Sequence, residues 1–140
     1  MAAKRAAAAG DDDPIPDLVI VTPTELARRG VELMHEHGVS QVIVAVTDEL
    51  PLASKEVSGT LSELQLMDKA FRDPGVLDRP VAEVMEPPMP MVGIGETVTD
   101  VVEALDRGPS VLVLDGGHPV GVLTRQDVLA FLAARAGATR

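Results

Sequence analysis

An internal repeat constrains the fold of this chain more than any other feature. Gly59-Thr-Leu-Ser62 and Gly121-Val-Leu-Thr124 lie 62 positions apart, and each has a strand-like approach, a glycine and a hydroxyl residue able to cap a helix. At the same offset, residues past each cap share one helix face, since Leu66, Met67, Ala70 and Phe71 match Val128, Leu129, Leu132 and Ala133. The chain is therefore predicted to contain two copies of one folding unit.

The match continues upstream with larger offsets. The runs 42–44 and 111–113 are short and β-branched at an offset of 69 residues, and the helix-spaced Ala27, Val31 and Met34 match Val98, Val102 and Leu105 at an offset of 71. The change from 69 to 62 means that the first copy carries seven extra residues between two strands. They fall in the polar, Pro-containing stretch 47–56, where a longer loop costs little. The second copy makes this connection through the turn signal DGGH at 115–118.

Each copy is predicted to run strand, helix, strand, strand, helix, which is an α/β (α+β) fold of two β-α-β-β-α repeats. The predicted elements are 18–21, 23–37, 41–46, 57–61 and 62–71 in the first copy, and 90–94, 97–107, 110–114, 119–123 and 124–135 in the second. Thr22-Pro-Thr-Glu25 predicts the start of the first helix through a capping box with proline at the first helical position. Because neither copy can bury both faces of a three-stranded sheet alone, we expect the two to pack together in a pseudo-two-fold arrangement.

The predicted organisation follows from these elements. Residues 1–16 form a flexible N-terminal segment or linker, and residues 17–72 form the first repeat. A Pro- and Asp-rich linker with one short helix near 80–85 occupies 73–89. The second repeat occupies 90–135, and residues 136–140 form a C-terminal tail.

Composition excludes several classes of function. A net charge of −10 opposes binding to nucleic acid or to an anionic membrane, both of which require clustered basic residues. The absence of cysteine excludes disulfides and thiolate metal sites and agrees with a cytoplasmic location, and no apolar run is long enough to span a bilayer. His35 and His37 do not share a helix face, so no metal is expected. No nucleophile–base constellation is present, so the chain is predicted not to be an enzyme.

Two segments carry a family resemblance. GHPVGVLTRQDVL at 117–129 resembles the closing half of a cystathionine-β-synthase-type (CBS) repeat, and PVAEVMEPP at 80–88 resembles the segment that opens one. The resemblance extends over about residues 17–135 and implies a tandem CBS pair, or Bateman module. More narrowly, VSGTLSE at 57–63 with Leu66-Met67, and the linker 73–80, resemble the C-terminal regulatory region of a bacterial, actinobacterial-type cystathionine β-synthase. In that family a separate pyridoxal-phosphate domain performs the catalysis, so the chain would be a fragment or a stand-alone relative.

The resemblance also implies a binding site for an adenosyl ligand. In the family pattern the acid accepts hydrogen bonds from both ribose hydroxyls, and the hydroxyl residue lies near the ribose or phosphate; these roles fall on Asp127 and Thr124. Val122 is expected to contact the adenine, Val39 and Gln41 match positions that touch the ligand in cystathionine β-synthases, and Arg125 could hold a phosphate. The first copy departs from the pattern, since Ser62 is followed by Gln65 where the acid would be, which predicts a weaker second cleft.

The nature of the ligand stays open at this level. S-adenosylmethionine has a net charge of about +1, which suits an acidic protein, whereas AMP or ATP could use Arg125, and the module could also bind no small ligand. The alternative to a ligand-binding role for Asp127 is that its carboxylate only stabilises the N-terminus of its helix. One hypothesis is therefore an allosteric sensor that controls a fused or partner enzyme. The other is a structural dimerisation module, and a homodimer is expected in both cases.

Overall fold

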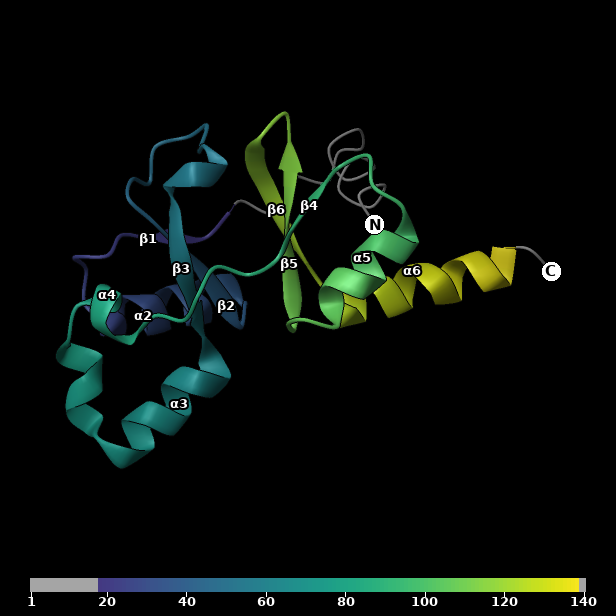
Figure 1. Cartoon of the computed structure of the whole chain (residues 1–140). Coiled ribbons are helices and arrows are strands. Elements are labelled where there is room, and N and C mark those ends of the chain that lie inside the picture. Colours follow the sequence, from purple (N-terminus) through teal and green to yellow (C-terminus); the bar gives the residue numbers. More distant parts are fainter. Residues whose placement is uncertain (1–17, 139–140) are drawn as a thin grey trace. The chain divides into compact units, whose positions relative to one another are not determined.

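The structure, a computed structural model, describes residues 18–138, so the predicted N-terminal segment 1–16 lies outside the described residues. The described chain separates into two compact units, one from Leu18 to Pro88 and one beginning at Met89. Each unit holds one three-stranded sheet, with the strand order β1-β2-β3 in the first unit and β4-β5-β6 in the second (Figure 1).

The first unit contains one complete repeat followed by the linker. Its elements are β1 (Ile20–Val21), α2 (Ala27–His37), β2 (Gln41–Ala45), the 3-10 turn η1 (Ser54–Glu56), β3 (Val57–Ser62), α3 (Glu63–Arg72), the 3-10 turn η2 (Pro74–Asp78) and α4 (Val81–Val84). Strand β2 is central, parallel to β1 and antiparallel to β3. The short helix α4 agrees with the helix predicted near 80–85, whereas η2 was not predicted.

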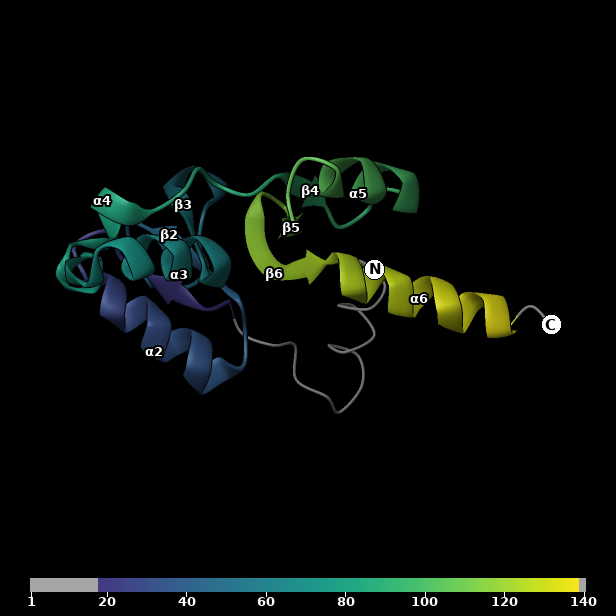
Figure 2. The same ribbon diagram turned by 90° about the horizontal axis from the view of Figure 1, so that it is seen from below.

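The second unit repeats this order. Its elements are β4 (Met91–Gly93), α5 (Val98–Leu105), β5 (Ser110–Asp115), β6 (His118–Thr124) and α6 (Arg125–Ala138). Strand β5 is parallel to β4 and antiparallel to β6. Helix α6 continues directly from the end of β6, as Figure 2 shows, and it extends beyond the predicted end at 135.

The strand registers confirm the repeat residue by residue. In the first sheet Ile43 pairs with Ile20 and Thr60, and in the second Leu112 pairs with Met91 and Val122. These partners are related by the three offsets read from the sequence, 71, 69 and 62. Both sheets also have a register shift at the matching place, between residues 44 and 45 and between 113 and 114. The predicted α/β fold of two β-α-β-β-α repeats is therefore confirmed.

Each unit has its own apolar core between one face of its sheet and its helices. In the first unit this face comes from β1, β2 and β3, and it packs against α2, α3 and α4; its main side chains are Val21, Ala27, Met34, Val42, Val44, Leu61, Leu66, Val81 and Val84. In the second unit the matching face packs against α5 and α6 through Val92, Val101, Ala104, Leu105, Val111, Val113, Leu123 and Val128. The alternation of side chains along a strand selects these residues.

Helix α2 begins at Ala27, later than the capping box predicts, so that prediction was wrong. The carboxylate of Glu25 does accept a hydrogen bond from the Thr22 N–H at 2.8 Å, but Glu25 N–H also donates to the Thr22 carbonyl at 3.1 Å, which closes a separate turn. Leu26 then adopts an extended conformation and forms a β-bridge with Pro80 of the linker. This long-range pairing delays the helix.

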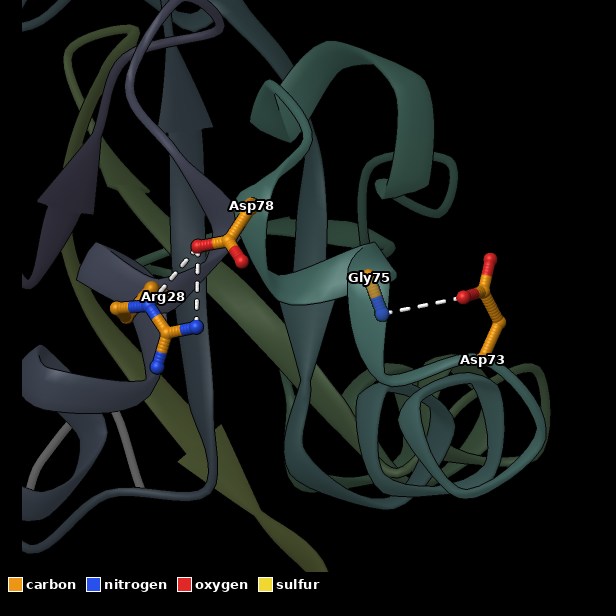
Figure 3. A network of polar contacts seen from close by, with 4 residues as sticks. All are labelled: Arg28, Asp73, Gly75 and Asp78. Carbon is orange, nitrogen blue, oxygen red and sulfur yellow. Dashed lines mark hydrogen bonds and ion pairs between the residues drawn. The ribbon is translucent and has the colours of Figure 1, made fainter.

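An ion pair between Arg28 and Asp78 attaches the linker to the first repeat (Figure 3). The Arg28 guanidinium on α2 donates to Asp78 Oδ1 from Nε at 3.1 Å and from Nη2 at 3.0 Å. Asp73 caps η2 by accepting from the Gly75 N–H at 3.1 Å, and its other oxygen accepts from Arg79 at 2.8 Å. All four charged side chains are half exposed or more, so each pair stabilises the fold only slightly.

The connection between the last two strands differs between the repeats as predicted. In the second unit Gly116 and Gly117 have φ of 61° and 83°, which allows a tight hairpin turn that residues with a Cβ rarely adopt. The longer connection of the first unit is not a purely polar loop, because Leu52 within it is fully buried. The Ala53 N–H donates to the Glu56 carboxylate at 2.8 Å, which holds this connection in a defined conformation.

Candidate ligand-binding site

Thr124 and Asp127 form a reciprocal pair at the junction of β6 and α6. The Asp127 carboxylate accepts hydrogen bonds at Oδ2 from the Thr124 N–H, at 2.9 Å, and from the Thr124 hydroxyl, at 3.2 Å. In return, the Asp127 N–H donates to the Thr124 hydroxyl at 3.2 Å. Both residues are half-buried. These contacts have the pattern of a capping box, which agrees with an acid stabilising a helix N-terminus. The same contacts also give the Asp127 carboxylate a defined orientation.

Two further predicted residues lie at this junction. Arg125 donates from Nη2 to the carbonyl of Leu105, the last residue of α5, at 2.8 Å. A cation at a helix C-terminus is favourable because the terminal carbonyls have no partner within the helix. Val122 is half-buried and pairs with Leu112, which puts it on the sheet face opposite the core residue Leu123. Four of the predicted residues are thus close together in the second unit.

Val39 and Gln41 belong to the first unit. Val39 follows Gly38, whose φ of 64° ends α2, and its N–H donates to the Met34 carbonyl at 3.0 Å. Val39 is half-buried and lines a hollow of about 370 Å³ together with Met34, His35, Gly38, Ser40 and Glu63. Gln41 begins β2 and pairs with Ser62 at the end of β3. The predicted residues therefore form two groups, one in each unit.

Ser62 and Gln65 lie at the same strand–helix junction of the first repeat. The Ser62 hydroxyl caps α3 by accepting from the Gln65 N–H at 3.2 Å. The Gln65 side chain does not return to its cap, since its amide nitrogen, oriented by its hydrogen-bond surroundings, donates to the two Glu86 carboxylate oxygens at 2.9 and 2.8 Å. Sequence reasoning missed Glu86. The local sequence gives one signal for it. Gln65 has an amide where the second repeat has the acid Asp127, and Lys69, one turn further along α3, can pair with a carboxylate.

An apolar groove lies between α2, α3 and η2 in the first unit and was not predicted. It has a volume of about 330 Å³ and is lined by Val31, Met34, His35, Glu63, Leu66, Met67, Ala70 and Leu77.

The helix faces that the sequence matched between the repeats are only partly buried. Leu66 and Val128 are buried, but Met67 and Leu129 are 62% and 65% exposed. Val31 and Val102 are also matched, at 40% and 41%.

Residues 18–138 show neither a cluster of metal ligands nor a membrane-spanning helix. Within that range no three His, Asp or Glu side chains are grouped as metal ligands would be. No helix in the same range is both long enough and apolar enough to cross a membrane.

Comparison with known proteins identifies the fold. Residues 81–134 match the family model of the CBS domain. Among solved structures, a putative signal-transduction protein with CBS domains from Burkholderia ambifaria has a TM-score of 0.72 at 19% identity, covering 91% of this chain and 90% of that one. A second is the CBS domain of a bacterial CNNM/CorC family Mg²⁺ transporter in complex with ATP, with a TM-score of 0.65 at 21% identity, covering 84% and 79% of the two chains. A third is CBSX2 in complex with AMP, with a TM-score of 0.65 at 23% identity, covering 88% and 90%.

Apart from Pro80, the matched segment contains both motifs at which the sequence resembles a CBS repeat, one in the linker and one at β6–α6. Residues 81–134 are thus similar to a CBS domain, and the fold of the chain matches that of CBS-domain pairs. The narrower resemblance to cystathionine β-synthase stays a prediction.

Proposed function

We propose that this chain is a non-catalytic regulatory module that binds an adenosyl ligand at the β6–α6 junction and thereby controls a fused or partner enzyme. The observation that carries the proposal is the half-buried Thr124–Asp127 pair, in which two main-chain or hydroxyl donors hold one carboxylate oxygen. A carboxylate oriented in advance loses little freedom on binding, which favours affinity.

The chemistry of the junction suits a nucleoside. A carboxylate is acceptor-only and has two oxygens, which match the two hydroxyl donors of a ribose. Arg125 uses Nη2 for the Leu105 carbonyl, and a guanidinium has five N–H donors in all, so we propose that it also holds a phosphate. We further propose that Val122 contacts the adenine, since aliphatic side chains are the main apolar material of this chain.

An adenine nucleotide is the ligand class best supported by similar structures, because one was solved with ATP and another with AMP. The net charge of −10 argues for the cation S-adenosylmethionine over ATP, which has a charge of about −4. Salt screens such fields within about 8–10 Å, so contacts at the site outweigh net charge. S-adenosylmethionine is therefore the second candidate ligand. From the sequence resemblance, we propose a cytoplasmic cystathionine β-synthase as the enzyme that the module regulates.

Thermal melts and titration calorimetry with AMP, ATP and S-adenosylmethionine test the proposal. At about 100 times its dissociation constant, a ligand should stabilise the protein by roughly 2.7 kcal/mol. Asp127→Asn keeps an acceptor for the Thr124 N–H but removes the charge, so we expect it to weaken binding by about 10- to 100-fold with little loss of stability. Asp115→Asn, at the exposed hairpin turn, is the matched control and should bind like the wild type. Binding unaffected by Asp127→Asn would refute the site.

A dimerisation module is the second candidate function. It is favoured by the exposed apolar stripe on α3, where Leu64, Met67 and Phe71 are 71%, 62% and 88% exposed. Apolar stripes of this kind are typical of interaction surfaces. A stable homodimer in sedimentation equilibrium, together with no response to any of the three ligands, would support this function over the sensor.

A further inference from the structure

We infer that the Glu86 carboxylate takes the place, in the first repeat, of the hydrogen-bond acceptor that Asp127 provides in the second. Because Glu86 already accepts from protein donors, we infer that it prevents a ribose diol from binding to the first repeat. The inference rests on the proposed function at Thr124 and Asp127 and explains why the module would have one adenosyl site although it has two repeats. The sequence predicted a weaker cleft in the first repeat only because Gln65 replaces the acid. The inference adds that a residue of the linker, Glu86, blocks this cleft.

The two repeats use the same position in opposite ways. In the second repeat the side chain of Asp127 turns back to its cap, Thr124, and remains at the strand–helix junction. In the first repeat the side chain of Gln65 turns away from Ser62 and donates to Glu86. In the second repeat the Asp127 carboxylate would accept from the hydroxyls of an incoming ribose. In the first repeat the Glu86 carboxylate already accepts from protein donors.

Glu86 is held by charge as well as by hydrogen bonds. The Lys69 ammonium on α3 forms an ion pair with Glu86 Oε2 and also donates to the carbonyl of Val84 at 2.8 Å. The side chains of Lys69 and Glu86 are 35% and 28% exposed, so solvent screens this pair less than a surface pair. In the second repeat the position of Lys69 is taken by Phe131, which has no charge to offer a carboxylate.

The backbone of the linker fixes Glu86 in place. The Thr60 N–H donates to the Glu86 carbonyl at 2.9 Å, and the Glu86 N–H donates to the Thr60 carbonyl at 2.8 Å. Residue 86 therefore forms a short antiparallel bridge with β3, just upstream of the junction that Ser62 caps. Because the N–H and the carbonyl of Glu86 are both hydrogen-bonded to Thr60, the Cα of Glu86 is fixed and its side chain is positioned to accept from Gln65.

The experiment measures the binding stoichiometry of AMP by titration calorimetry in four proteins: wild type, Gln65→Asp, Gln65→Asp/Glu86→Ala and Gln65→Asp/Glu83→Ala. In Gln65→Asp the new carboxylate would face that of Glu86, so we expect the stoichiometry of the wild type, one AMP per chain. Removing Glu86 as well should add a second AMP per chain. Glu83 is an exposed acid of α4, and the variant that removes it is the matched control, expected to bind one AMP.

A second AMP in Gln65→Asp alone, or in the Glu83 control, would overturn the inference, and so would the absence of an added AMP in Gln65→Asp/Glu86→Ala. Wild-type binding tests the proposed function separately, because the inference concerns only the difference between variants. Hydrogen exchange of the Thr60 amide without ligand gives an independent readout. It should be at least severalfold faster in Glu86→Ala than in Glu83→Ala, and equal rates would mean that the Glu86 side chain does not fasten the linker.

Discussion

Gly59 permits the linker to cross β3, and Gly59→Ala is therefore the most informative test of the first unit. A Cβ added at Gly59 would lie 2.5 Å from the Glu86 carbonyl oxygen and 2.8 Å from Met85 Sδ. The thioether of Met85 could move, but the carbonyl belongs to the main chain that forms the bridge with Thr60. The linker must therefore shift as a whole.

The cost has two parts. Overpacking a well-packed site costs about 1–3 kcal/mol. The shift would also break the two backbone hydrogen bonds between Thr60 and Glu86, each worth about 1 kcal/mol. Together these effects lower the free energy of unfolding by roughly 3–5 kcal/mol, a large fraction of the about 5–15 kcal/mol typical of a domain.

Urea denaturation followed by circular dichroism measures this loss. With a slope of about 2 kcal/mol/M, the unfolding midpoint of Gly59→Ala should fall by roughly 1.5–2.5 M. Gly95→Ala is the control, since Gly95 has no atom within 4 Å of an added Cβ, and its midpoint should stay within error of the wild type or rise slightly. If both variants unfold at the wild-type midpoint, the linker does not press on Gly59, and the placement of Glu86 beside β3 is wrong.

Two further predictions concern stability. Leu52 is fully buried although it lies in a loop, so Leu52→Ala should lower the free energy of unfolding by about 2–5 kcal/mol in urea denaturation; Leu50→Ala, at a 60% exposed position, should change it by less than about 0.5 kcal/mol, and equal effects would contradict the burial. Thr97 caps α5 by accepting from the Asp100 N–H at 3.2 Å, so Thr97→Ala should cost about 1 kcal/mol and speed hydrogen exchange of that amide, whereas Thr99→Ala should do neither; an unchanged exchange rate in Thr97→Ala would exclude the cap.

The sequence by itself determined the parts of the fold that depend on local order. The three offsets relate the strand pairing of Leu112 in the second sheet to that of Ile43 in the first, because equivalent strands of a repeat keep equivalent registers. The two glycines at 116 and 117 predicted the tight hairpin, and Thr124 predicted the start of α6. The hairpin turn and the helix start depend on dihedral preferences or hydrogen bonds within a few residues.

Only the tertiary structure decided which distant groups meet. The start of α2 moved to Ala27 because Leu26 pairs with Pro80, and Leu52 became a core residue inside a stretch that looks polar. Gln65 is engaged because the linker brings Glu86 against it, some twenty residues further along the chain. Local patterns record which side chains a segment can bury or cap, but not which other segment crosses it. That crossing is what distinguishes the first repeat, with its acceptor position occupied from within, from the second.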